Sequence, residues 1–209
     1  HTVAATPTNK PRPTAAPTVV QAAGPAATTP PGVVLDFETF GSWRRGDEPY
    51  GSFEQTAEQV HSGKHGAKVR YDFPAVEKNY VVFRRQPAAP VSGQPGALTL
   101  WVFGDGSGHF LNAWVRDSQG EVRAVSFGQI TLAGAWGAMT APLDTSAPWP
   151  QGHISGPDNG RLDFPITLDS LVLDGVPDSG GPFSGTIYLD DLSTGSAPLA
   201  AASPASQDK

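Results

Sequence analysis

The sequence predicts an all-β protein, an antiparallel β-sandwich with low-complexity segments at both ends. Three observations support this prediction. Gly (24 residues) and Pro (21 residues) together exceed a fifth of the 209-residue chain, which is typical of short strands joined by many turns. Stretches of about six residues with strand-like patterns recur between turn signals. Beyond a single turn near residues 54–59, no segment shows convincing helical spacing.

The N-terminal segment differs from the rest of the chain in composition. Ala, Pro and Thr occupy 22 of positions 1–32, and no sustained periodicity is present. Such a segment buries too little apolar surface to offset the entropy of ordering, and its prolines favour extended chain. Residues 1–32 are therefore predicted to be an arm or linker, whose threonines are open to O-glycosylation. Residues 194–209, rich in Ala, Ser and Pro, are predicted to be a tail.

Between these ends, the body at 33–193 contains nine predicted strands. The stretch at 67–73 alternates strictly between inward and outward residue types. A turn at 117–120 separates two of the strands, and Gly or Pro clusters separate most others. The predicted strands cover 33–38, 67–73, 80–83, 98–103, 110–116, 122–127, 138–143, 168–173 and 186–190.

Charge and cysteine content exclude several functional classes. The net charge of −6 comes without a basic stripe, which argues against a nucleic-acid partner. The absence of cysteine removes disulfides, thiolate nucleophiles and sulfur-ligated metals. No apolar run approaches the roughly 18 residues that a membrane span requires. The chain begins at His1 without a signal segment, which is typical of a processed or excised product.

No arrangement of residues predicts catalysis, so no catalytic residues are assigned and a non-enzyme is expected. The common nucleophile, zinc-hydrolase and phosphate-loop motifs are missing, and the five histidines lack metal-ligand spacing. Asp190 and Asp191 are adjacent on a predicted strand and therefore point to opposite faces, unlike the facing carboxylates of a glycosidase. Asp105 lies in a Gly-Asp-Gly turn, where its side chain is expected to stabilise the backbone.

Four elements, in this order, resemble carbohydrate-binding modules with a jelly-roll fold, which belong to the galactose-binding-like superfamily. The resemblance spans about 33–192 and implies a sandwich, an extracellular or cell-surface setting, and a polysaccharide or other glycan as partner. Similar domains are appended to secreted bacterial glycosidases. The matching elements are LDFE at 35–38, SGKHGAKV at 62–69, FGDGSG at 103–108 with the turn at 117–120, and IYLDDL at 187–192.

The resemblance also implies a structural calcium where the first and last strands lie side by side. Ca²⁺ requires six to eight oxygen ligands, which carboxylates and loop carbonyls supply. Carried over to this sequence, Glu38 and Asp190 would give carboxylates, Ser62 and Lys64 carbonyl oxygens, and Asp36 is a weaker candidate. The alternative is that these acids are solvated or paired with lysines. If calcium is bound, chelation is expected to lower the melting temperature by several degrees.

Strand alternation predicts a possible ligand-binding face. Thr99, Trp101 and Phe103 share one face of their strand, and Asn112, Trp114 and Arg116 share one face of the next. The turn at 104–108 predicts that these two strands are antiparallel neighbours, which would put both sets on one surface. Aromatic rings stack on the C–H groups of sugars, while Asn and Arg bind hydroxyls. The alternative is that this face packs beneath the loop at 145–161.

Aromatic residues in two loops form further candidates for ligand binding. Trp43 and Tyr50 lie in a Gly/Pro-rich segment beside Arg44 and Arg45. Trp149 lies between two prolines, and loop residues of this kind either bind ligands or cover the end of a sandwich.

Two functions agree with these patterns. The first is a binding module that attaches a larger secreted protein to glycan, with residues 1–32 as tether. The second is a structural subunit of an extracellular filament or surface layer, in which the arm docks on a neighbouring copy. In that case residues 18–21 would add a strand to an exposed sheet edge, and such head-to-tail contacts propagate into filaments unless they close. The resemblance favours the first.

Overall fold

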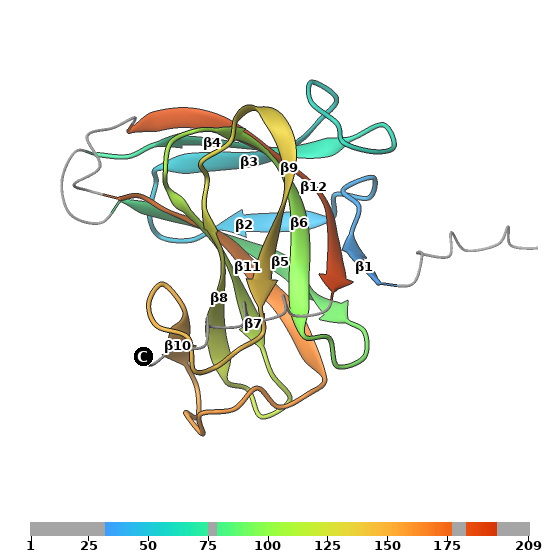
Figure 1. Ribbon diagram of the computed structural model, residues 1–209, viewed down its shortest axis with the longest axis vertical. Helices are drawn as coiled ribbons and strands as arrows, with labels where there is room; N and C mark the ends of the chain where they lie inside the picture. Colours follow the sequence, from blue (N-terminus) through green and yellow to red (C-terminus); the bar gives the residue numbers. More distant parts are fainter. Residues whose placement is uncertain (1–31, 75–78, 177–182, 196–209) are drawn as a thin grey trace, which may run out of the picture.

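A computed structural model describes residues 32–74, 79–176 and 183–195, which contain twelve strands and no helix (Figure 1). Residues 1–31 of the predicted arm and 196–209 of the predicted tail lie outside the described residues. The strands are β1 (Val33–Leu35), β2 (Ser42–Arg45), β3 (Gly51–Thr56), β4 (Gly66–Asp72), β5 (Tyr80–Val91), β6 (Ala97–Asp105), β7 (Phe110–Arg116), β8 (Val122–Gln129), β9 (Ala133–Pro142), β10 (Gly152–Ser155), β11 (Ile166–Asp174) and β12 (Ser184–Gly195).

The strands form two six-stranded antiparallel sheets. Sheet A has the order β3-β4-β12-β6-β9, and β1 also pairs with β12. Sheet B has the order β10-β8-β7-β11-β5-β2. The predicted antiparallel β-sandwich is therefore confirmed, with three short strands (β2, β3 and β10) that the sequence pattern did not reveal.

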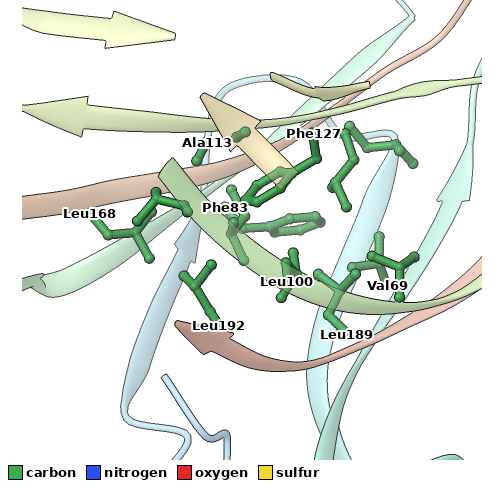
Figure 2. Packing of buried hydrophobic residues seen from close by; sticks show 14 of the residues in the cluster. Val69, Phe83, Leu100, Ala113, Phe127, Leu168, Leu189 and Leu192 are labelled. Carbon is green, nitrogen blue, oxygen red and sulfur yellow. The ribbon is translucent and has the colours of Figure 1, made fainter. Parts of the chain in front are cut away.

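The core lies between the two sheets and is built from alternate residues of the long strands. Leu98, Leu100 and Val102 of β6 are each 0% exposed, as their alternation with polar or aromatic neighbours predicts. Removal of such side chains from water is the main favourable contribution to folding. Figure 2 shows side chains of both sheets in this cluster, among them Val69, Leu100, Leu189 and Leu192 of sheet A, and Phe83, Ala113, Phe127 and Leu168 of sheet B.

The first and last strands of the body lie side by side, as the resemblance implied. Val33 is opposite Ser193 and Leu35 is opposite Leu192. The Thr194 N–H donates to the Gly32 carbonyl at 2.6 Å, so the chain enters and leaves the described body at one place (Figure 1).

Two expectations about local structure are wrong. The segment at 54–59 forms no helical turn, because its first half belongs to β3. Strands β6 and β7 are not neighbours, because β6 lies between β12 and β9 whereas β7 lies between β8 and β11. The physical reason is that the turn between them crosses from one sheet to the other. Its N–H groups bond to the segment joining β8 and β9, with Gly106 N to Leu132 O at 2.7 Å and Gly108 N to Ile130 O at 2.9 Å.

Candidate functional site

The outer face of sheet B carries a set of side chains aligned across three strands. On β7, Asn112 and Trp114 point outward because Leu111, Ala113 and Val115 occupy the core. Across the sheet, these β7 residues and Phe110 each lie in a row with one residue of β11 and one of β5. The rows are Asn112–Val172–Val82, Trp114–Ser170–Arg84 and Phe110–Asp174–Tyr80. Cross-strand register therefore brings residues from three distant parts of the sequence onto one surface.

A pocket of about 280 Å³ lies on this surface, and we call it the β7 pocket. Tyr80, Asn112, Trp114 and Asp174 line it from the sheet. Residues 149–154, which lead into and form β10, line the opposite side. Trp149 is 71% exposed, and its ring meets the Phe110 ring edge-on at a centroid distance of 5.2 Å. Two tryptophans from separate segments thus border one opening.

Two amide oxygens of the β7 pocket lack hydrogen-bond partners among the described residues. Asn112, only 1% exposed, donates its Nδ2 to Asp174 Oδ2, an orientation that the carboxylate enforces because it accepts only. Its Oδ1 is left buried without a donor, and so is Oε1 of Gln151. A buried acceptor without a donor costs free energy. A ligand that donates hydroxyl hydrogens would remove that cost.

Asp174 is a partly buried carboxylate that lines the β7 pocket. Burial raises its pKa above the usual value for aspartate, and the hydrogen bond from Asn112 opposes this shift only in part. At pH values between the ordinary pKa of an unfolded aspartate and the raised pKa of folded Asp174, the folded state binds more protons than the unfolded state. Its contribution to stability is therefore greatest at low pH and declines as pH rises through that range. A destabilising acid in a pocket is a candidate for ligand contact.

Asp174→Asn is therefore expected to raise the melting temperature at neutral pH by a few degrees while weakening ligand binding. The increase in melting temperature over the wild type should be largest at pH values above the raised pKa of Asp174. It should be smallest in acid, where wild-type Asp174 is already protonated. Thermal melts of both proteins between acidic and neutral pH measure this difference. Asp169→Asn is the control, because it removes a paired carboxylate and should lower the melting temperature at neutral pH. Equal or lower stability of Asp174→Asn at neutral pH would contradict the assignment.

An ion-pair network flanks the pocket beside Trp114. The guanidinium of Arg84 lies over the Trp114 ring at 5.2 Å, a cation–π arrangement. Asp169 pairs with both Arg84 (Nη1 to Oδ2, 3.3 Å) and Arg116 (Nη2 to Oδ1, 2.8 Å). The predicted ligand residue Arg116 therefore lies on the pocket's face but not in its lining. Its charge is shared with Asp169, so this flank offers no free cation for an anionic ligand.

A buried ion pair anchors the segment at 143–165 that carries the pocket's second side. Arg123 Nη1 donates to Glu121 Oε1 at 2.6 Å, and Glu121 is 0% exposed. Arg123 also donates to Thr145 O at 3.2 Å, while Glu121 Oε2 accepts from the Asn159 N–H at 3.3 Å. Two points of the loop are thereby tied to Arg123 of β8 and to Glu121 just before that strand. Sequence reasoning missed this pair, since two charges separated by one residue carry no distinctive signal.

The remaining predicted ligand residues lie elsewhere. Trp101 is on the outer face of sheet A, where its ring stacks on His61 at a centroid distance of 3.8 Å. The prediction that it shares a surface with Trp114 is wrong, because their strands belong to different sheets. Trp43 is in β2, packs edge-on against Phe53 at 4.7 Å and donates its Nε1 to Phe40 O. Tyr50 packs against the core and lines a separate cavity.

Comparison with known structures identifies the architecture that presents this pocket. A family 11 carbohydrate-binding module from Clostridium thermocellum, in complex with a β-1,3-1,4-mixed-linked tetrasaccharide, superposes with a TM-score of 0.53 over 79% of this chain and 95% of that one, at 16% identity. The solution structure named CtCBM11 gives a TM-score of 0.54 over 82% and 99%, at 17% identity. The chain has the jelly-roll fold of carbohydrate-binding modules. Comparisons with family models and with curated proteins found no match.

The two carboxylates expected at the seam of this jelly roll both face the loop at 61–65. Glu38 Oε1 accepts from the N–H groups of Lys64 at 2.6 Å and His65 at 2.8 Å, and these bonds lower its pKa. Asp190 Oδ2 accepts from the N–H groups of His61 at 2.9 Å and Ser62 at 3.2 Å. The loop thus meets these oxygens with N–H donors, where the resemblance implied carbonyl ligands from Ser62 and Lys64. Asp36 instead accepts from the Glu38 N–H at 3.1 Å.

Three oxygen atoms gather close to Gly66, beside Asp190. A Cβ atom at Gly66 would lie 3.1 Å from Gln59 O, 3.2 Å from Leu189 O and 3.6 Å from Asp190 Oδ2. Asp190 is 0% exposed, and burial raises its pKa despite three N–H donors. Ca²⁺ prefers oxygen ligands such as carbonyls beside a carboxylate whose charge the neighbouring donors neutralise only in part. Within the described ranges, no group of three or more His, Asp or Glu side chains could hold a metal. Of the two carboxylates, Asp190 is the better placed for the ion, because the Gln59 and Leu189 carbonyl oxygens lie on the same side of Gly66 as its Oδ2.

The part of the chain that the structure describes contains no helix long and apolar enough to cross a membrane.

Proposed function

We propose that this protein is a non-catalytic extracellular module that binds polysaccharide in the β7 pocket. The observation that carries the proposal is that Trp114 and Trp149 border a pocket whose lining includes two unpartnered amide oxygens. Tryptophan faces stack on sugar rings, and amide oxygens accept hydrogen bonds from sugar hydroxyls. The jelly-roll fold shared with the family 11 module, which was solved with a mixed-linked tetrasaccharide, supports the same conclusion.

The chemistry of the pocket favours uncharged glycans over acidic ones. Asn112 Oδ1, Gln151 Oε1 and the Asp174 carboxylate are all acceptors and would repel the carboxylate of a uronic acid. The nearest arginines, Arg84 and Arg116, are already paired with Asp169. A neutral polysaccharide can donate hydroxyl hydrogens to all three acceptors without adding negative charge.

The pocket also lacks what hydrolysis would require. Glycoside hydrolysis in most families uses two facing carboxyl groups. Asp174 is the one carboxylate among the residues that line the pocket, and its Oδ2 already accepts from Asn112. Binding without turnover is therefore the proposed activity.

The full chain should be tested by isothermal titration against a neutral mixed-linked β-glucan, a neutral xylan and polygalacturonate. We expect binding to at least one neutral polymer and none to polygalacturonate. Failure to bind any polymer in a wider glycan panel would overturn the proposed function. Preference for polygalacturonate would keep a binding role but overturn the assignment of the three acceptors.

Calcium bound beside Asp190 is a second part of the proposal. The Asp190 carboxylate with the Gln59 and Leu189 carbonyls would hold the ion, which would tie β12 to the loop before β4. Because an ion bound only to the folded state stabilises it, EDTA is expected to lower the melting temperature by several degrees. The Cβ of Gly66→Ala would lie only 3.1 Å from Gln59 O and 3.2 Å from Leu189 O, so it would push these oxygens apart, and the melting temperature of this variant should not respond to EDTA. Identical melting curves of the wild-type protein with EDTA and with added calcium would contradict the proposal.

A further inference from the structure

The two sheets end in edge strands of very different length. Sheet B ends in β10 and β2, which have four residues each, and sheet A ends in β3, which has six, and β9, which has ten. Each edge presents unpaired backbone N–H and C=O groups, and longer edges can pair more extensively with another chain. Strand β9 is therefore the edge with the greatest capacity for pairing among the described strands.

Charge protects other edges but not β9. Natural edge strands avoid pairing with other chains by being short or by carrying charged residues. Strand β2 contains Arg44 and Arg45, and β3 contains Glu54. The sequence of β9, AGAWGAMTAP, contains no charged residue, and its single proline is the last residue.

The β9 edge is also accessible. Along its length β9 pairs with β6, from Ala133 opposite Asp105 to Pro142 opposite Ala97, and no other described strand pairs with it. Ala133, Gly134, Ala135 and Ala138 are exposed, and Leu132 just before the strand is 38% exposed. Small exposed side chains leave room for another strand to approach.

We propose that β9 is a self-association edge, through which two copies of this chain pair antiparallel about a two-fold axis and join their A sheets. Antiparallel pairing of a strand with its own copy satisfies two-fold symmetry, since the same surface serves both partners. Because β9 is uncharged, its copy meets no like-charge repulsion. The β9 edge is outside the β7 pocket, which is built on sheet B, so this inference does not depend on the proposed function.

An aromatic row on the outer face of sheet A supports a second copy of this chain as the partner. Tyr188, Phe103 and Trp136 lie on adjacent strands, with edge-on ring contacts at 5.9 Å and 5.7 Å. The row ends at Trp136 on the β9 edge. With Ala138 facing its copy across the joint, Trp136 would lie opposite Thr140 of the second copy, so both aromatic rows would lie on the same face of the joined sheet.

Sedimentation velocity of the full chain over roughly a hundredfold range of concentration tests the proposal. We expect a monomer–dimer equilibrium whose dissociation constant rises roughly tenfold in Ala138→Lys, because like charges would face each other across the joint. Ala138→Glu should have the same effect, and an equimolar mixture of the two variants should regain dimers. Ser52→Lys, an exposed position on the β3 edge, is the matched control and should leave association unchanged.

Three results would overturn the proposal. The wild-type chain could remain monomeric at every concentration. Ala138→Lys and Ala138→Glu, with melting curves like that of the wild type, could associate as strongly as the wild type. Association could instead vanish in Val19→Lys/Val20→Lys while persisting in Ala138→Lys, which would assign the contact to the predicted arm strand at 18–21, outside the described residues.

Discussion

Trp149→Ala is expected to weaken binding of a neutral polysaccharide by roughly 30-fold, which corresponds to about 2 kcal/mol, the loss typical of a central aromatic contact. Trp149 borders the β7 pocket and is 71% exposed. Among the aromatic rings that the structure describes, its ring contacts that of Phe110, edge-on. Removing it should therefore leave stability within about 0.5 kcal/mol of the wild type. Trp114→Ala should weaken binding to a similar extent, because its ring lines the same pocket from the sheet.

Trp101→Ala is the matched control for both variants. It removes the same side chain from an outward position on a long strand, but from sheet A. Isothermal titration with one polysaccharide should therefore give the wild-type affinity for Trp101→Ala. Unchanged affinity in Trp149→Ala and Trp114→Ala, or a loss in Trp101→Ala alone, would place the ligand away from the β7 pocket.

Arg123→Met is expected to cost about 3–5 kcal/mol of unfolding free energy, the range for leaving one member of a buried ion pair uncompensated. Glu121 is 0% exposed and would lose its guanidinium partner, and the loop carbonyl of Thr145 would lose its donor. Urea unfolding at neutral pH measures the change. Because the same pair holds the segment that carries Trp149, the surviving folded protein should also bind polysaccharide more weakly.

Arg116→Met provides the comparison for this effect. The Arg116 side chain is 44% exposed, and Asp169 would keep its pair with Arg84, so the loss of Arg116 should cost at most about 1 kcal/mol. Restoration of stability in the double variant Arg123→Met/Glu121→Leu would show that the unpaired charge causes the loss. Equal costs for Arg123→Met and Arg116→Met would contradict a structural role for the buried pair.

Local alternation predicted the faces of individual strands but not which strands would be neighbours. Leu98 and Leu111 face the core and Trp101 and Trp114 face outward, because the period of two is a property of a single strand. Pairing is decided by distant contacts. The turn at 104–108 bonds to the segment at 130–132, and nothing within the turn itself indicates that partner. This is why Asn112 and Trp114 were grouped correctly while Trp101 was not.

The rest of the β7 pocket depends on cross-strand register that local patterns do not encode. Tyr80 and Asp174 reach it because β11 pairs with β7 and β5 pairs with β11, and Gln151 reaches it because the segment leading into β10 lies beside the same strands. At the seam, the resemblance implied Asp190 as a calcium ligand, whereas the other two oxygens of the proposed site, those of Gln59 and Leu189, belong to the backbone. Backbone oxygens occur at every residue, so composition cannot single them out.

The short pairing of β1 with the end of β12 determines how the body would respond to tension. Gly32 and Thr194 are joined by one hydrogen bond, and β1 and β12 run antiparallel away from that point. A pull on the two flanking segments would load the bonds of this pair one after another, as in a zipper, because the ladder bonds are perpendicular to the strands. The seam would therefore open at low force, and stretching would peel β1 away before it strained sheet B, which carries Trp114.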